Sequence, residues 1–405
     1  MGMPRVAVIG GSIGGLTAAN LLRDIGCEVD VYERTPQLLS GFGTGIVVQP
    51  ELVRYLVERA GASLDDVSVP SSSMRYYDAS TSRLQGEVDA GWRFTAYNAV
   101  YRKLLDAFGT ERYHLGRALT RIQQTEAGPV VEFAEGPPAA ADLVVCSDGG
   151  GSVARTALLG VQPAYAGYVT WRGMVDQDEV SAQTWEFFQD SFSYGLLPDS
   201  HLIAYPIPQV GADGRLTGRP RLNFQWYWNV AEGPELDALM TCCEGNRRPV
   251  SVHYDLLAEP NLAEFRDRAA RELDGPFREL ITAAATPFVT IVSDAEIDRM
   301  AFGNVVLIGD AAITPRPHAA AGAAKAASDA WSLAAHLEKA GGNLAAALPA
   351  WEPAQLAVGH AYLAKVRAMA AVLQHGGDFP PGAQEYRFGL PEVTGFPRVP
   401  GLNEE

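Results

Sequence analysis

Cysteine is scarce in this chain. Only four cysteines occur among 405 residues, and Cys242 and Cys243 are adjacent while Cys27 and Cys146 lie far apart. A disulfide framework or a structural zinc site requires regular cysteine spacing, which is absent here. The sequence therefore predicts reduced thiols, a cytoplasmic location and no bound metal.

Basic residues and long apolar runs are also few. The chain has 32 Lys and Arg against 48 Asp and Glu, a net charge of -16. Nucleic acids and anionic membranes attract clustered positive charge, so neither is an expected partner. No run of 18 apolar residues predicts a membrane span, and no basic, apolar leader precedes the first predicted strand, so no signal peptide is expected.

What the sequence does contain suits a large soluble globular protein of the α/β (α+β) class. A chain of this length exceeds one compact core and fits two domains, or one domain with a large insertion. Strand and helix signals alternate in residues 1–160 and again in 301–375, whereas aromatic β-stretches dominate 161–300. We expect an interleaved Rossmann-like domain, a β-sheet domain, C-terminal helices, and an extended Gly/Pro-rich tail over 376–405.

The strongest local pattern is the stretch from Arg5 to Arg34. A β-branched run ends at Gly10, apolar residues then recur at helical spacing to Gly26, and a second apolar run ends in Glu33. This order predicts a βαβ unit with a glycine turn. Such a turn places helix N–H groups against a pyrophosphate, and an acid about 20 residues later accepts hydrogen bonds from a ribose.

The motif departs from GxGxxG at one position, because Ser12 stands in place of the second glycine. Serine is small, so we expect the backbone still to approach a phosphate. Gly10 is predicted to make the tight turn and Gly15 to permit close packing of helix on strand. An ordinary βαβ unit without a ligand remains the alternative.

Two further glycine turns follow apolar strands. Asp148-Gly149 follows the strand at 142–146, with Ser152 and Arg155 next at helical spacing. Gly309-Asp310 follows the strand at 304–308, with Pro317 and Gly322 downstream. Because strand ends of a parallel sheet meet at one edge, three such turns suit one long ligand that crosses several strands.

The remaining chain yields coarser expectations. Helices are predicted where apolar residues recur at helical spacing, and strands where they alternate or form aromatic runs. The predicted helices are 50–60, 97–108, 261–272, 322–339 and 349–375, and the predicted strands of the middle region are 165–175, 194–208 and 221–230.

Together, the three motifs resemble a known family, the single-component FAD-dependent aromatic hydroxylases of the p-hydroxybenzoate and salicylate hydroxylase type. The resemblance covers about residues 6–335. Within the family, the segments SGFGTGIVVQPELV, GYVTWRG, HLIAYPIP and PHAAAGAAKAASDAW are most similar to members that hydroxylate 2,6-dihydroxypyridine at carbon 3.

The resemblance implies bound FAD, with NADH or NADPH and O2 as co-substrates and a C4a-hydroperoxyflavin as the oxygen donor. It places Ser12 to Gly14 at the pyrophosphate, Glu33 on the ribose, Arg102 toward the phosphates and Asp310 on the ribityl chain. The full set of expected FAD contacts is Gly10, Gly11, Ser12, Ile13, Gly14, Gly15, Glu33, Arg34, Val47, Arg102, Leu119, Asp148, Gly309, Asp310, Pro317, Ala320, Ala321, Gly322, Ala323 and Ala324.

Four residues are candidates for substrate chemistry. His201 and Tyr205 are four apart in a predicted strand and so share a face, where they can polarise a hydroxypyridine. Arg316 and His318 flank Pro317 in the expected flavin loop and can hold an oxyanion or exchange a proton. Gln49 and Tyr227 are weaker candidates for substrate binding. Each has a plain structural alternative, as a sheet, core or surface side chain.

The stretch RLNFQWYWNV predicts two strand faces. Arg221, Asn223, Gln225 and Tyr227 alternate with Leu222, Phe224, Trp226 and Trp228. Its Trp-x-Trp resembles part of a flavin-dependent halogenase motif, but the Ile-Pro that completes that motif is missing, so an aromatic sheet face is preferred. Trp171 and Arg172 are interpreted as structural residues at a domain junction.

We therefore expect a hydroxylase of a small hydroxylated aromatic or pyridine ring, 2,6-dihydroxypyridine first among them, working as a homodimer. The alternatives are a hydroxylase of another phenol, of a hydroxynicotinate or of a natural-product ring, and an FAD-binding redox protein that does no oxygen chemistry.

Overall fold

The predicted βαβ unit forms the centre of a parallel sheet. The computed structural model describes residues 2–39, 44–211 and 214–391. Strand β1 (Arg5–Ile9), helix α1 (Ile13–Asp24) and strand β2 (Glu28–Tyr32) follow the expected order, and β1 pairs in parallel with β2 and with β12 (Leu143–Cys146). The first two motif turns therefore leave neighbouring strands.

The third motif joins the same sheet. Strand β20 (Val305–Leu307) lies parallel to β12, so the six-stranded order is β19-β20-β12-β1-β2-β8, with β19 (Ala301–Phe302) and β8 (Tyr113–His114) at its edges. All four central strands, β20, β12, β1 and β2, are parallel. Their carboxyl ends meet at one edge, as the sequence predicts.

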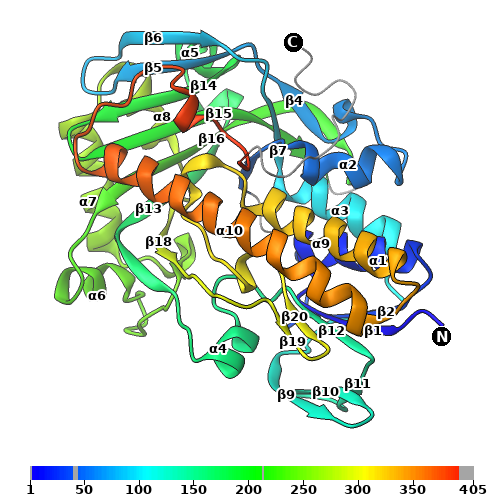
Figure 1. The fold of residues 1–405 in the computed structure, drawn as a ribbon. Helices are drawn as coiled ribbons and strands as arrows, with labels where there is room; N and C mark the ends of the chain where they lie inside the picture. Colours follow the sequence, from blue (N-terminus) through cyan, green and yellow to red (C-terminus); the bar gives the residue numbers. More distant parts are fainter. Residues whose placement is uncertain (1, 40–43, 212–213, 392–405) are drawn as a thin grey trace.

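A layer of helices packs around α1, which lies against β1 and β2. Helix α1 contacts α3 (Tyr97–Phe108) and α9 (Gly322–Lys339), and α9 also contacts α2 (Pro50–Glu58) and α10 (Leu344–Gln374). Figure 1 shows α9 and α10 running side by side across the molecule. The predicted bounds of α3 and α9 are confirmed.

The second large sheet has eight strands in the order β17-β18-β13-β16-β15-β14-β5-β6. Its strands are β5 (Ser73–Asp78), β6 (Arg83–Asp89), β13 (Ala164–Asp176), β14 (Ser191–Leu197), β15 (Ser200–Val210), β16 (Leu216–Asn229), β17 (Ser251–Val252) and β18 (Phe288–Asp294). The hairpin β5–β6 belongs to residues 1–160 but extends this sheet, with β5 parallel to β14. The division into the four predicted segments remains a prediction.

The middle region differs from the prediction in two ways. The expected strand 194–208 is a hairpin, because Pro198 and Asp199 turn the chain between β14 and β15, with Asp199 at φ 54°. One helix was expected, yet the described residues hold four: α5 (Ala182–Phe188), α6 (Pro234–Met240), α7 (Glu259–Glu272) and α8 (Gly275–Ala283). Three of these are shorter than ten residues, too short for periodicity to identify.

The two faces of β16 confirm the predicted alternation. Leu222, Phe224 and Trp226 are buried in the second core, where Phe265 of α7 and Phe277 of α8 pack against the sheet. The opposite face carries Asn223, Gln225 and Tyr227 and points toward the first sheet, so the cavity between the two sheets is lined by polar and aromatic groups.

Helix α10 was predicted to begin at Pro349 but begins at Leu344. The side chain of its N-cap, Asn343, accepts a hydrogen bond from Ala346 N, and Pro349 and Pro353 lie inside the helix. It is the one helix of the described chain long and apolar enough to cross a membrane, although core helices pass the same test. This helix buries Trp351 and Tyr362 and packs against α9.

Three smaller features complete the fold. The strands β3 (Gly45–Val47), β7 (Arg93–Ala96) and β4 (Ser68–Pro70) form a small sheet that contacts β15. Strand β9 (Leu119–Thr125) pairs with β10 (Gly128–Phe133), and β11 (Ala139–Ala140) extends this sheet. Short helix α4 (Val153–Leu159) follows the second motif.

The C-terminal segment 376–391 packs against the second sheet. Phe379 stacks on Tyr386 and contacts Tyr194, while Phe388 contacts Phe192 and Trp92. Gly389 N donates to Ala319 O at 3.0 Å. The expected tail from residue 376 is thus well packed as far as Pro391, and the rest of that prediction lies outside the described residues.

Candidate functional site

A groove of three successive cavities follows the edge where the motif turns meet. The first, of 550 Å³, lies beside Glu33 and Asp148; the second, of 180 Å³, lies at Ser12 and Gly322; the third, of 330 Å³, lies under the second sheet. Neighbouring cavities share lining residues, including Ser12 and Asp310. The groove therefore connects the βαβ turn with the aromatic sheet face.

The glycine turn has the geometry that a pyrophosphate needs. Gly10 has φ +99°, and a Cβ on Gly15 would lie 1.8 Å from Gly10 O, so neither position accepts a side chain. Ser12 Oγ lies 2.8 Å from Tyr97 OH, which explains how serine is accommodated. No side chain caps α1, and no acid lies in its first turn. Its free N–H groups therefore face the second cavity.

The second and third motif turns are joined by one buried arginine. The guanidinium of Arg155 donates to Asp310 O at 2.9 Å and to Thr314 Oγ1 at 3.0 Å. Asp148 accepts from Ser152 Oγ at 2.6 Å and so fixes the start of α4. Burial raises the pKa of the Asp310 carboxyl to about 6. The Ser and Arg of the second motif thus hold two turns together.

Most of the predicted FAD residues line the groove. Those that do are Gly10, Ser12, Ile13, Gly14, Glu33, Arg34, Val47, Leu119, Asp148, Asp310, Pro317, Ala320, Gly322 and Ala323. The others, Gly11, Gly15, Arg102, Gly309, Ala321 and Ala324, line none of the three cavities.

Three of these other residues stabilise the loops themselves. Gly11 N donates to Glu33 Oε2, Gly309 N to Asp329 Oδ2 and Ala321 N to Tyr362 OH, at 2.8 to 2.9 Å. Their N–H groups are therefore engaged by side chains of the protein.

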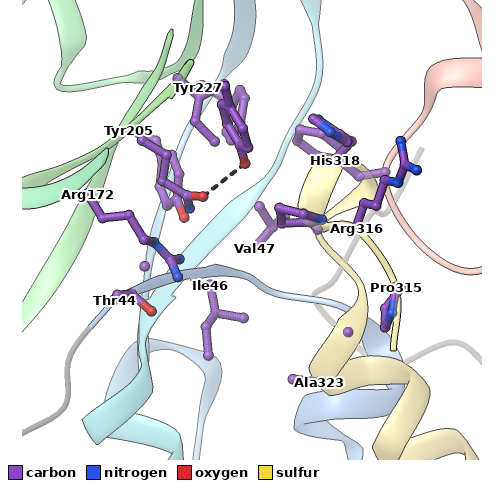
Figure 2. A pocket seen from close by; sticks show the side chains of 18 of the residues that line it. Thr44, Ile46, Val47, Arg172, Tyr205, Tyr227, Pro315, Arg316, His318 and Ala323 are labelled. Atoms are coloured by element: carbon purple, nitrogen blue, oxygen red, sulfur yellow. Dashed lines mark hydrogen bonds between the residues drawn. The ribbon is translucent and has the colours of Figure 1, made fainter. Parts of the chain in front are cut away.

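Four strands of the second sheet form the floor of the third cavity. The strand register aligns residues of β13, β16 and β15 in rows across the sheet. One row holds Thr170, Tyr227 and His201, and the next holds Arg172, Gln225 and Ile203. Tyr205 lies beside Asn223 in the row after that. Figure 2 shows Tyr205 and Tyr227 pointing into the cavity, where Tyr227 OH donates to Gln225 Oε1 at 3.0 Å.

The predicted pair His201 and Tyr205 both line this cavity, as does Tyr227. The His201 ring stacks on Tyr227 at 4.2 Å with an interplanar angle of 9°, and Gln374 Nε2 donates to its Nδ1 at 2.9 Å. Burial and the nearby His318 lower the pKa of His201 well below its ordinary value. His201 is therefore a neutral, oriented imidazole.

The predicted pair Arg316 and His318 lies opposite the sheet (Figure 2). His318 Nε2 is 2.7 Å from Tyr168 OH, whereas its Nδ1 is buried without a hydrogen-bond partner. Burial, with a smaller effect of Arg316, lowers the pKa of His318 to about 3. Arg316 itself pairs with Asp294 at 2.7 Å. One position of the His318 ring is thus available for a ligand.

Gln49 is not brought into this cavity. It precedes helix α2 and is buried, with Nε2 lacking a partner, and its Oε1 lies beside Gly389 of the C-terminal segment. By contrast, several lining residues were missed, and Arg172 and Phe388 are two of them. Arg172 was interpreted as structural, although a lone arginine amid an apolar strand signals a special environment, and Phe388 comes from the tail, where no periodicity pointed to a site.

Comparison with known proteins agrees with this geometry. Residues 5–53 match the family described as pyridine nucleotide-disulphide oxidoreductase, and residues 165–294 match the family described as FAD binding domain-like. The chain is 56% identical over 390 residues to a 2,6-dihydroxypyridine 3-monooxygenase of Paenarthrobacter nicotinovorans, covering 96% of each chain.

Comparison with solved structures also finds similar hydroxylases. The structure of 2,6-dihydroxypyridine-3-hydroxylase from Arthrobacter nicotinovorans superposes with a TM-score of 0.93 at 55% identity, covering 98% of this chain and 99% of that one. Klebsiella pneumoniae HpxO, solved with FAD and uric acid, shares the fold with a TM-score of 0.75 at 23% identity, covering 92% and 90%.

The groove fits FAD on its own evidence. It is long, it begins at a buried acid, and it passes the uncapped N-termini of α1 and α9, neither of which has an acid in its first turn. With the relatives above, these features show that the chain is an enzyme and belongs to the FAD-dependent aromatic hydroxylases, which are flavoprotein monooxygenases.

Proposed function

We propose that this enzyme hydroxylates 2,6-dihydroxypyridine at carbon 3, using FAD, NADH or NADPH, and O2. The observation that carries the proposal is 56% identity over 96% of the chain to a relative of that named activity. The cavity under the second sheet supports it, because its 330 Å³ suit a single small ring and its floor offers imidazole and phenol groups.

FAD, when bound and reduced, supplies the oxygen chemistry. The chain must hold the ring, exclude water and assist loss of a hydroxyl proton, since an ionised ring is a better nucleophile. Tyr205 and Tyr227 are proposed to bind the ring on the sheet side. Both are buried and both line the cavity.

His318 is proposed to accept a hydrogen bond from a hydroxyl group of the substrate ring. Its depressed pKa keeps the ring neutral at pH 7, and its partnerless Nδ1 can accept or donate one hydrogen bond. Tyr168, bound to the other nitrogen, orients the ring. His201 is proposed to bind a second ring substituent, and Arg316 to hold positive charge near His318 through its fixed pair with Asp294.

The remaining assignments concern the residues that contact FAD and those that support the cavity. Glu33 and Arg34 are proposed to contact the ribose end of FAD, Arg102 its phosphates and Asp310 its ribityl chain. Gln49 is proposed only as an indirect support of the cavity, through the C-terminal segment. We further propose that the enzyme is a cytoplasmic homodimer.

The test is aerobic NADH and NADPH consumption by the purified yellow protein with 2,6-dihydroxypyridine, 6-hydroxynicotinate and simple phenols, with product mass determined. We expect 2,6-dihydroxypyridine to gain one oxygen, coupled to cofactor oxidation. Oxidation that yields only hydrogen peroxide with this ring, or product only from another ring, would reject the substrate. The variant His318→Ala should retain FAD but lose most turnover, while the exposed His253→Ala serves as its control.

A further inference from the structure

An arginine that forms no ion pair with the described residues lies in the floor of the aromatic cavity. Arg172 is central in β13, between Trp171 and Gly173, which both face the second core. Its side chain emerges on the opposite face and lines the third cavity. Figure 2 shows it extending from the sheet toward Thr44 and Ile46 of the first domain.

The charge of Arg172 is not neutralised by the protein. Its Nε is buried without a hydrogen-bond partner, and no carboxylate of the described residues forms an ion pair with it. Two other arginines have such partners: Arg221 pairs with Asp176 at 2.7 Å, and Arg316, which lines the same cavity, pairs with Asp294. A buried charge without a counter-ion is strongly unfavourable, so an anionic ligand that enters the cavity would stabilise Arg172.

The surroundings of Arg172 indicate what that partner is. The groups that act on its charge are the hydroxyls of Tyr227 and Tyr205, which also face the cavity, while burial lowers its pKa. Asp310 is the one carboxylic acid among the lining residues, and the positive charges that act on its pKa are those of Lys325 and Arg155. The guanidinium thus adjoins the proposed ring-binding groups, and its planar donors suit a delocalised anionic oxygen.

We propose that Arg172 binds an anionic oxygen of the substrate ring, so that the enzyme selects the ionised form of its substrate. This inference rests on the proposed function for the identity of the ring. Under that function the oxygen is a ring oxyanion of 2,6-dihydroxypyridine; a ring carboxylate presents the same chemistry. Arg172 would stabilise this anion relative to the neutral ring.

The experiment measures binding to the FAD-loaded enzyme without NADH or NADPH. Each ligand is titrated while the flavin absorbance spectrum is followed, which yields a Kd that does not depend on turnover. The probes are 2,6-dihydroxypyridine, 6-hydroxynicotinate and unsubstituted pyridine, which has no acidic group. The variants are Arg172→Met, which removes the charge and keeps most of the stem, Arg172→Lys, which keeps the charge, and the paired Arg221→Met as control.

We expect Arg172→Met to raise the Kd of 2,6-dihydroxypyridine about 10- to 100-fold, the usual effect of losing a charged hydrogen bond, and to change the Kd of pyridine less than about 3-fold. Arg172→Lys should lie between wild type and Arg172→Met, because it retains the charge but loses the fork geometry. Arg221→Met should bind all three ligands as wild type does.

Equal weakening of charged and uncharged rings, or no weakening at all, would overturn the proposal. If Arg172→Met does not retain FAD, the comparison uses Arg172→Lys instead. The proposal would then be overturned if Arg172→Lys bound 2,6-dihydroxypyridine and pyridine with the same Kd values as wild type. A wild-type enzyme that binds 6-hydroxynicotinate but not 2,6-dihydroxypyridine, with the same selective loss in Arg172→Met, would reject the proposed substrate and support the role of Arg172.

Discussion

His201 and His318 are buried in the wall of the aromatic cavity, and both are held in the neutral state. Their folded-state pKa values lie below the ordinary value of 6.5, that of His318 at about 3, chiefly because burial penalises the charged ring. Below pH 6.5 the unfolded chain therefore takes up protons that the folded chain refuses, and the free energy of unfolding falls.

The pH dependence of stability follows from this difference. We expect each histidine to lower the free energy of unfolding by about 2 kcal/mol between pH 8 and pH 5. Replacing His318 with Gln should remove about half of the combined loss. Urea unfolding of the FAD-saturated enzyme at several pH values measures it.

The variant His253→Gln, which replaces an exposed histidine, is the matched control. An identical pH profile for His318→Gln and wild type would show that His318 is not held neutral by its burial.

At the level of single residues, the sequence was informative where a residue type has few uses. Gly10 and Gly15 were identified because only glycine fits their geometry. His201 was identified from its strand spacing with Tyr205. Arg172 was missed because its environment depends on a strand register with β16 that only long-range pairing determines. Gln49 was expected to reach the ring from the first domain, but Val47 lines the cavity and Gln49 does not.

Among the structural elements, the C-terminal segment has the clearest functional consequence. Phe388 lines the aromatic cavity and contacts Phe192 at 4.8 Å, so it closes one side of the site. We expect Phe388→Ala to admit water, so that less product and more hydrogen peroxide form per NADH or NADPH consumed. It should also lower the free energy of unfolding by about 3 kcal/mol.

Tyr386→Ala is the control for this variant. Tyr386 lies in the same segment and stacks on Phe379, but it does not line the cavity. Peroxide and product are measured together in one assay. Equal yields of product from both variants would rule out a sealing role for Phe388.

Elements with long, regular patterns were predictable and short or irregular ones were not. Helices α3 and α9 match their predicted bounds because their apolar residues repeat over 12 and 18 residues. The start of α10 was missed because Pro349, a common first residue of helices, lies in its second turn. There the packing of Leu348 and Trp351 outweighs the lost hydrogen bond.

At the scale of the whole molecule, the FAD groove is built from segments far apart in the chain. Gly10, Asp148 and Gly322 all line it, and they come from the start, the middle and the last third of the sequence. A ligand that contacts all three segments binds only the folded state. We expect FAD at 100 times its Kd to raise the free energy of unfolding by about 2.7 kcal/mol.

The melting temperature at increasing FAD concentration measures this effect. It should rise steadily with the logarithm of FAD concentration. Riboflavin, which lacks the adenylate half and cannot reach Glu33, should give a smaller rise at equal concentration. A melting temperature that FAD does not change would show that the groove is not its binding site.

The strand order of the six-stranded sheet also bears on how the chain is made. Strand β12 pairs on one side with β1, which leaves the ribosome early, and on the other with β20, which follows some 160 residues later. While the second sheet is being synthesised, the β20-facing edge of β12 has no partner, and unpaired apolar edges invite pairing with other chains. The nascent chain is thus most prone to aggregation before residue 305 emerges from the ribosome. Molecular chaperones that shield strand edges would matter most in that interval.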